Sequence, residues 1–194
     1  AQDGLNVCLT VDEIIQHFTE KSLEKWLVEY EAKRVMAVIM DVKTGEILSM
    51  ASKPDYNPQE PYDMSYYYGE DYKALTEGKT QEEGLNLGYT MWKNNVGQDN
   101  YEPGSTMKIF TTAVALEENV ATLDTEYVCK GIEYVTGIPL RCWRWKRPHG
   151  VETLLEGVQN SCNPVFIKVG EQIGVDRYFD YFEDFRLTEK TGIQ

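Results

Sequence analysis

The stretch that organises this chain is Tyr101-Glu102-Pro103-Gly104-Ser105-Thr106-Met107-Lys108, which is followed by the apolar run 109–116. Pro103 favours an extended conformation at the residue before it, and Gly104 can adopt backbone angles that other residues avoid. An apolar run of this kind predicts a mostly buried helix. Ser105 is therefore expected at or near the N-terminus of that helix, where unpaired N–H groups and the helix dipole favour developing negative charge.

Lys108 follows Ser105 by three residues, so the two side chains project over the same face of the predicted helix. A serine hydroxyl is a weak nucleophile until a base removes its proton, and a desolvated, neutral lysine can be that base. A bare Ser-x-x-Lys pattern is common by chance, and its ordinary interpretation is a helix-capping serine beside a solvated lysine. The context favours catalysis, because Ser161-Cys162-Asn163 supplies a second motif. Ser-x-x-Lys combined with a Ser-x-Asn-type motif is typical of penicillin-binding proteins and serine β-lactamases.

With these two motifs the chain resembles the transpeptidase domain of a class B penicillin-binding protein, of the sporulation or elongation type. The resemblance runs from about Leu5 to the end and includes the stretch 40–51. It implies an α+β fold, the penicillin-binding or serine transpeptidase fold, in which helices flank an antiparallel sheet. It also implies that the third family motif, a Lys-Thr-Gly on an edge strand, lies well over a hundred residues beyond the second. We therefore expect residues 1–194 to be a partial transpeptidase domain with an incomplete sheet.

Two Lys-Thr-Gly triplets do occur, at 43–45 and 190–192, and neither is expected to be the third motif. The first falls in a predicted turn between two strands. The second lies in a stretch, 186–193, that resembles the family's loop after the helices that follow the second motif. Because the third motif would supply a carboxylate-binding site and an oxyanion-hole donor, we expect this piece to be inactive on its own.

Composition excludes several classes of function. A chain of 194 residues with 42% hydrophobic and 12% aromatic residues can bury one substantial core. Its formal charge of −13 argues against a nucleic-acid partner and against an acidic membrane surface. No segment approaches the ~20 apolar residues of a membrane span. Because class B relatives carry an anchor upstream, the intact protein is expected at the cell membrane, with this domain on the extracytoplasmic side.

Periodicity predicts the elements around the motifs. We expect a strand over 5–10 with Cys8 buried in it, and then a helix capped by Thr10 or Asp12. The runs 34–41 and 46–51 predict a hairpin that turns at Gly45. Residues 59–100 show no sustained period, and 129–150 read as loop-rich. Helices are predicted over 153–158, 164–173 and 178–185. No linker separates two domains.

The resemblance implies acyl transfer. Ser105 would attack the D-Ala-D-Ala carbonyl of a peptidoglycan stem peptide, Lys108 would take its proton, Ser161 would relay a proton to the leaving amine, and Asn163 would hold the substrate amide or the lysine. The Ser105 N–H would be one oxyanion donor. β-Lactam antibiotics would acylate the same serine, and a membrane glycosyltransferase is an expected partner. The alternatives are a β-lactam sensor and a catalytically inactive binding scaffold. No organic cofactor is expected.

A cluster of metal-ligand residue types surrounds the second motif: Cys129, Cys142, His149 and Cys162. This inventory suits a tetrahedral Cys₃His zinc site, although the spacings are looser than those of a zinc finger. Some class B penicillin-binding proteins resemble this pattern and hold zinc with Asp, His and Cys ligands at similar intervals. Two alternatives stay open: a Cys129–Cys142 disulfide, because the domain would work outside the membrane, and free buried thiols.

Overall fold

The computed structural model describes residues 4–69 and 72–190, which belong to two compact units. Of the described residues, 4–69 and 72–100 form the N-terminal unit and 101–190 form the C-terminal unit. Within the described residues every strand pairing is antiparallel, and helices pack against the strands in both units. This is the predicted α+β architecture. The 190–192 triplet is not placed, because Thr191 and Gly192 lie outside the described residues.

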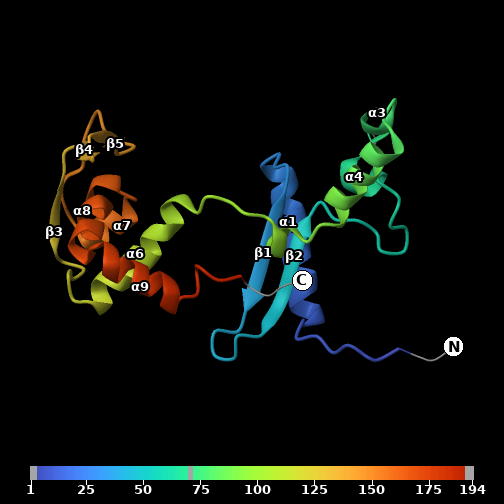
Figure 1. Ribbon diagram of the computed structural model, residues 1–194, viewed down its shortest axis with the longest axis horizontal. Helices are drawn as coiled ribbons and strands as arrows, with labels where there is room; N and C mark the ends of the chain where they lie inside the picture. The colour runs from blue at the N-terminus through green and yellow to red at the C-terminus, as the bar shows by residue number, and fades with distance from the viewer. Residues whose placement is uncertain (1–3, 70–71, 191–194) are drawn as a thin grey trace. The chain divides into compact units, whose positions relative to one another are not determined.

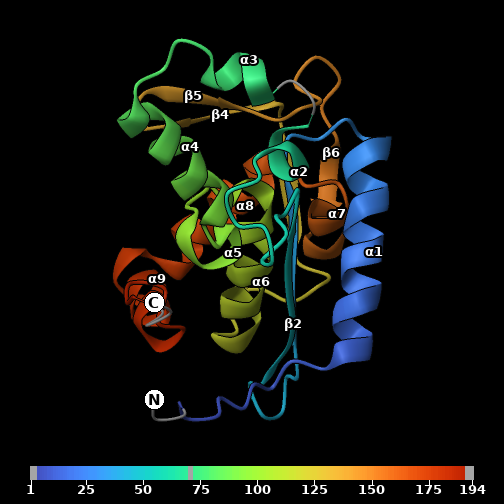
Figure 2. The same ribbon diagram turned by 90° about the vertical axis from the view of Figure 1, so that its right-hand side faces the viewer.

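In the N-terminal unit, helix α1 (Glu13–Glu29) packs along the hairpin of β1 (Val35–Met40) and β2 (Ile47–Lys53), as Figures 1 and 2 show. Asp12 caps α1, as predicted, because its Oδ1 accepts the N–H groups of the second and third helical residues at 2.9 Å. Gly45 closes the hairpin turn with φ of +77°. The hairpin predicted from the two apolar runs is thus confirmed.

Gln16 joins α1 to β2. Its Oε1 accepts hydrogen bonds from Met50 N at 3.0 Å and from Ser49 Oγ at 2.8 Å, and its Nε2 donates to Met50 O at 3.1 Å. A side-chain amide that satisfies both backbone groups of one strand residue fixes the helix at a single position along the strand. Buried Lys53 adds an ion pair with Asp55 at 2.6 Å.

Among the described residues, four helices follow the hairpin in this unit, and the sequence did not predict them. They are α2 (Ser65–Tyr68), α3 (Tyr72–Thr76), α4 (Gln81–Trp92) and α5 (Asn95–Gln98). Helix α4 starts with a capping box, in which Thr80 Oγ1 accepts from Glu83 N and the Glu83 carboxylate accepts from Thr80 N. The Thr-x-x-Glu pattern at 80–83 was the available signal.

The strand predicted over 5–10 is wrong, as is the burial of Cys8. No described strand pairs with this segment, and Leu5 is 98% exposed and Val7 83% exposed. The segment is held only where it meets the hairpin, because Thr10 Oγ1 donates to Ile47 O at 2.6 Å and Asp12 N donates to Leu48 O at 2.9 Å. Apolar alternation alone cannot supply a partner strand, so Cys8 is exposed.

The C-terminal unit starts with a 3₁₀ turn, η1 (Gly104–Thr106), which leads into α6 (Met107–Glu117). Its remaining elements are β3 (Glu126–Cys129), β4 (Ile132–Val135), β5 (Ile138–Arg141), β6 (Gly150–Thr153), α7 (Leu154–Gln159), α8 (Asn163–Ile173) and α9 (Val175–Asp184). Strand β3 pairs with β6, and β4 pairs with β5. The helices predicted after residue 152 are confirmed to within a few residues at each end.

The segment 129–150 is less irregular than predicted. A tight hairpin joins β4 to β5 through Thr136 and Gly137, which both have positive φ, 51° and 84°. A two-residue turn with positive φ at both positions matches the right-handed twist of the paired strands. The Thr-Gly pair between two short apolar runs was the signal, but the strands are only four residues long.

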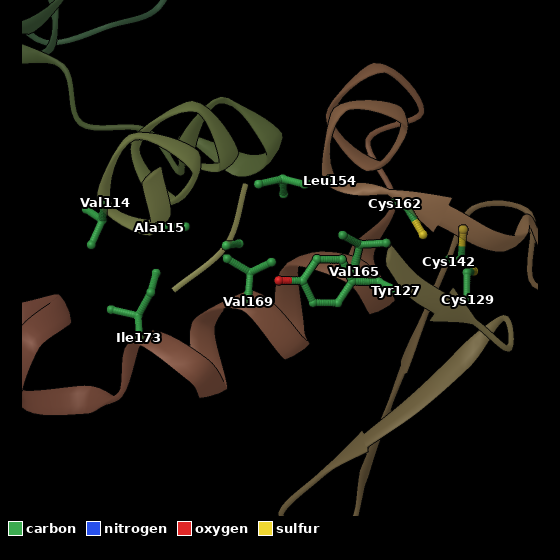
Figure 3. Packing of buried hydrophobic residues seen from close by; sticks show 11 residues of the cluster. Val114, Ala115, Tyr127, Cys129, Cys142, Leu154, Cys162, Val165, Val169 and Ile173 are labelled. Carbon is green, nitrogen blue, oxygen red and sulfur yellow. The ribbon is translucent and has the colours of Figure 1, made fainter. Parts of the chain in front are cut away.

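One buried cluster forms the core of the C-terminal unit (Figure 3). Helix α6 contributes Val114 and Ala115, and α8 contributes Val165, Val169 and Ile173. Gly157 lets α7 approach α8 closely, because a Cβ at that position would lie 2.7 Å from Val165 Cγ1. The three buried cysteines belong to the same cluster, so the core adjoins the turn between α7 and α8.

Candidate active site

Local backbone geometry presents Ser105 at the start of α6. Gly104 has φ of +56°, in the left-handed region, and the 3₁₀ turn follows directly. Because Lys108 lies one turn further along, its Nζ is 3.2 Å from Ser105 Oγ. The predicted placement of the Ser-x-x-Lys motif at a helix N-terminus is confirmed.

The second motif occupies the turn between α7 and α8. Asn160 ends α7, and Ser161 takes a left-handed backbone conformation with φ of 50°. Cys162 is the N-cap residue of α8, and Asn163 is its first residue. Backbone bonds fix the turn, since Ser161 N donates to Val158 O at 3.0 Å and Cys162 N donates to Gly157 O at 2.9 Å. A non-glycine residue in this conformation costs roughly 1–3 kcal/mol, and such residues cluster at functional sites.

The amine of Lys108 joins the two motifs. Within 3.2 Å of Nζ lie Ser105 Oγ, Ser161 O (2.8 Å), Ser161 Oγ (2.9 Å) and Asn163 Oδ1 (2.7 Å). Ser161 Oγ also donates to Ser105 Oγ at 2.9 Å. The structure therefore brings together the four residues that the sequence proposed as catalytic.

The four contacts suit a neutral amine. A protonated lysine offers three N–H donors and no lone pair, whereas a neutral one offers two donors and one acceptor site. Ser161 O and Asn163 Oδ1 can only accept, so two N–H groups would satisfy them. The lone pair is then free to accept a hydroxyl proton from Ser105. In the neutral form, the amine can therefore accept the proton of the nucleophile without breaking either of these two hydrogen bonds.

The electrostatics shift the protonation equilibrium of Lys108 toward the neutral form. Burial lowers the pKa of Lys108 from its ordinary value, because desolvation disfavours the charged form. The nearby Cys162 and Cys142 thiols oppose that shift to a smaller extent. A lowered pKa increases the fraction of neutral lysine near neutral pH, which is the form that can act as a general base.

A cleft lies beside this cluster, with a volume of about 580 Å³. Besides Lys108 and Asn163 it is lined by Pro139, Leu140, Arg141, Phe166 and Ile167. Asn163 Nδ2 donates to Arg141 O at 2.8 Å, so the β4–β5 hairpin helps to orient the asparagine. The cleft has an apolar side and a polar end at Lys108 and Asn163, which is the ordinary form of a substrate site.

The predicted metal ligands also come together. One ligand atom from each of Cys129, Cys142, His149 and Cys162 can be chosen so that all four lie within 4.8 Å of one another. The three thiols gather at one end of the core (Figure 3), and all three cysteines are buried and free. Burial raises the pKa of Cys142 and of Cys162. Cys142 Sγ lies 3.5 Å from His149 Nδ1.

Comparison with known proteins decides the family. The family model described as "Penicillin binding protein transpeptidase domain" matches residues 35–194. This chain belongs to the penicillin-binding protein transpeptidase family. It is 39% identical over 193 residues to "Stage V sporulation protein D" of Bacillus subtilis (strain 168), and covers 26% of that protein. It is 28% identical over 193 residues to "Peptidoglycan D,D-transpeptidase MrdA" of Escherichia coli (strain K12), and covers 28% of that protein. Both alignments include 99% of this chain.

A solved transpeptidase structure is similar as well. The crystal structure of the "D,D-Transpeptidase Domain of Peptidoglycan Glycosyltransferase from Eggerthella lenta" superposes with a TM-score of 0.66 at 30% identity. The match covers 90% of this chain and 36% of that one. The chain therefore spans between a quarter and two fifths of the lengths of these relatives. No helix among residues 4–69 and 72–190 combines the length and apolar character that crossing a membrane requires.

Three contributors to this candidate site were missed by the sequence prediction. The Arg141 carbonyl orients Asn163, and Trp143 Nε1 donates to Asn160 O at 2.8 Å in the turn before Ser161. The third is Glu152, which is 3% exposed and lies beside His149. Backbone carbonyls leave no trace in a sequence. A lone glutamate on a short strand is normally solvated, so it also gave no signal.

Proposed function

We propose that the intact protein is a peptidoglycan D,D-transpeptidase that works through a serine acyl-enzyme. The observation that carries the proposal is the contact of Lys108 Nζ with the hydroxyls of both Ser105 and Ser161, closed by the Ser161–Ser105 hydrogen bond. A nucleophile, a base and a proton relay within 3.2 Å of one another form the minimum set for acyl transfer. Membership of the family supports the same reaction class.

In the acylation step, Ser105 Oγ forms a bond to the carbonyl carbon of the penultimate D-alanine, and its proton passes to the neutral Lys108 amine. The peptide C–N bond then breaks. The leaving nitrogen receives its proton through the Ser161 hydroxyl, which Lys108 reprotonates, and D-alanine departs. In the second step an amine of a neighbouring stem peptide attacks the ester and gives up a proton through the same groups. Ser105 Oγ recovers its proton, so the enzyme is unchanged.

β-Lactams would react at the same atom. Their strained amide places a carbonyl where the dipeptide carbonyl would lie, and ring opening leaves an ester on Ser105 without a leaving group that diffuses away. Because the chain belongs to the penicillin-binding protein transpeptidase family, we propose a slowly turning-over target and not a hydrolase.

The direct test is cross-linking by the intact protein. A donor peptide ending in D-Ala-D-Ala and an acceptor amine should give free D-alanine and cross-linked product in equal amounts, and Ser105→Ala should give neither. Ser22→Ala, an exposed serine on α1, is the matched control and should retain full activity. Acylation of Ser105 by a β-lactam without any cross-linked product would favour a sensor. Absence of both would favour an inactive scaffold.

We also propose that the cysteine cluster binds Zn²⁺. Thiolates and a neutral imidazole are the ligands that zinc prefers in closed structural sites. The four atoms lie within 4.8 Å of one another, so side-chain shifts of about 1 Å would bring them to the ~3.8 Å separation of a tetrahedral site with bonds of about 2.3 Å. The fit has a further support: His149 Nε2 is buried and has no hydrogen-bond partner among the described residues. Zinc would compensate the charge of the buried thiolates and tie Cys162, between Ser161 and Asn163, to β3 and β5. Elemental analysis of protein purified without chelator should find zinc. Less than about 0.2 ion per chain, or a Cys129–Cys142 disulfide in active protein, would end the proposal.

The proposed peptidoglycan substrate indicates where in the cell the intact protein would work. Because peptidoglycan is cross-linked outside the cytoplasmic membrane, we propose that the intact protein is membrane-anchored with this domain on the extracytoplasmic face. The 39% identity to a stage V sporulation protein supports a role in sporulation. The similar Eggerthella lenta domain belongs to a protein named a peptidoglycan glycosyltransferase, which supports a glycosyltransferase as partner or fused domain. A membrane-impermeant fluorescent penicillin should label intact cells that express the protein, but not cells that express Ser105→Ala.

A further inference from the structure

Strand β6 reverses the usual alternation of apolar and polar residues. Val151 is 61% exposed, whereas its neighbour Glu152 is 3% exposed. In the register with β3, Glu152 lies opposite Tyr127, and Gly150 lies opposite Cys129. Since alternate residues share a face, Glu152 is on the same face of the two strands as Cys129. Burying a carboxylate costs free energy unless its oxygens have hydrogen-bonding or ionic partners. Each Glu152 oxygen is therefore expected to have such a partner.

Only one of the two Glu152 oxygens has a hydrogen-bond partner among the described residues. Oε2 accepts a hydrogen bond from Asn160 Nδ2 at 2.9 Å. Oε1 lies 3.1 Å from His149 Nδ1 but without hydrogen-bond geometry, and it has no other partner. His149 Nε2 is also buried and has no hydrogen-bond partner among the described residues. Two buried side chains, each with a polar atom that lacks a hydrogen-bond partner, therefore lie beside each other. The Glu152 side chain is 4% exposed and the His149 side chain is 3% exposed.

The partner of Oε2 leads to the catalytic turn. Asn160 is the residue before Ser161, and it caps the C-terminus of α7 through a bond from its N–H to Glu156 O at 2.8 Å. Its carbonyl accepts from Trp143 Nε1, and its side chain is held by Glu152. Both sides of Asn160 are thus fixed immediately before the left-handed residue that carries the relay hydroxyl.

We propose that Glu152 is the positioning residue that joins the metal site to the second motif. Its Oε1 accepts the N–H of whichever His149 ring nitrogen is not bound to the metal, while its Oε2 holds Asn160 and, through it, the Ser161 turn. A metal-bound histidine commonly donates its other ring nitrogen to a carboxylate, which fixes the ring's orientation and increases its basicity as a ligand. Metal binding would therefore give a partner both to the His149 ring and to Glu152 Oε1. The inference rests on the zinc site proposed above.

The test compares Glu152→Gln with the wild-type intact protein and with Glu126→Gln, which changes an exposed glutamate on the paired strand β3. Glutamine keeps the size of the side chain and an oxygen for Asn160, but its amide cannot also accept from the imidazole. Zinc affinity would be measured by competition with a chromophoric chelator, and the ligand field by the visible spectrum of the Co²⁺-substituted protein. Thermal unfolding would be followed with and without zinc.

We expect Glu152→Gln to weaken zinc binding about 10- to 100-fold and to shift the Co²⁺ bands, with Glu126→Gln unchanged. The zinc-dependent rise in Tm should shrink, whereas the Tm of the metal-free protein should stay close to wild type. Wild-type zinc affinity with an unshifted Co²⁺ spectrum in Glu152→Gln would overturn the inference and leave the zinc site standing. Equal loss of Tm with and without zinc would also overturn it, because the residue would then be merely structural. A wild-type protein that binds no zinc would overturn the site and the inference together.

Discussion

Two clusters of reactive side chains share the Ser161–Asn163 turn, and they differ in how completely protein atoms satisfy them. In the first, Lys108 contacts Ser105, Ser161 and Asn163, and Asn163 also donates to Arg141 O. In the second, Cys129, Cys142, His149 and Cys162 are packed into the core. There, His149 Nε2 and Oε1 of the adjacent Glu152 have no hydrogen-bond partner among the described residues. The first cluster is satisfied by protein atoms, whereas the second leaves buried polar atoms without a partner in the described part of the chain.

The difference has a physical origin in solvent access. Ser105 is exposed and Lys108 half-buried beside an open cleft, so substrate can enter and water can satisfy any remaining donor. The thiols of the second cluster are nearly fully buried, and burial raises the pKa of two of them. Reactive thiols at accessible sites have lowered pKa values, so this cluster is suited to structure and not to nucleophilic chemistry. Perturbing each cluster should therefore give a different pattern of effects.

The largest expected effect comes from the first cluster. Lys108→Ala removes the base and should slow acylation of Ser105 by a fluorescent penicillin by about 10²-fold or more, because general-base catalysis contributes roughly that much. Zinc content should be unchanged. Lys130→Ala, an exposed lysine in the same unit, is the control and should acylate at the wild-type rate. A Lys108→Ala protein that acylates normally would mean that the base lies elsewhere.

The pH dependence of acylation is the next test. The neutral form of Lys108 is the active one, so the rate should rise with pH, about tenfold per pH unit below the lysine pKa, and then level off. Because burial lowers that pKa, the midpoint should lie below the ordinary lysine value of about 10.4. Ser105, Ser161 and Asn163 face the amine without titrating in this range, and burial raises the pKa values of the nearby Cys142 and Cys162 thiols. A midpoint at or above about 10.4 would contradict a desolvated base.

A smaller effect on the reaction, but a larger one on stability, is expected from the second cluster. Cys162→Ser should lose most of the bound zinc and lower Tm by roughly 5–10 °C, since a structural metal contributes directly to folding. Acylation should slow only about tenfold or less, because every side chain that touches the nucleophile remains. Cys8→Ser is the matched control, since Cys8 is exposed and outside the cluster. If Cys162→Ser abolished acylation at unchanged Tm, the division of roles between the two clusters would be wrong.

The sequence predicted the chemistry better than the surroundings that support it. Local patterns place Ser105 and Lys108 one turn apart, and helix-breaking residues place Ser161 between two helices, so these predictions need only nearby residues. The prediction of a strand over 5–10 was wrong because a strand needs a distant partner, which the alternation of apolar and polar residues does not reveal. The role of Glu152 was missed because Glu152 is buried and its apolar neighbour Val151 is exposed, which is the reverse of the usual alternation in a strand. The buried setting of the cysteines depends on the fold, although their residue types were a sufficient signal for a metal site.

The measurement that tests the central claim most directly is the site of β-lactam attachment in the intact protein. Intact mass followed by peptide mapping should find one penicilloyl group per chain, on the peptide that contains Ser105. The adduct should be absent from Ser105→Ala and present at full occupancy in Ser22→Ala. An adduct that persists in Ser105→Ala, or that maps to Ser161 or to a cysteine, would contradict the assignment of Ser105 as the nucleophile and the mechanism built on it.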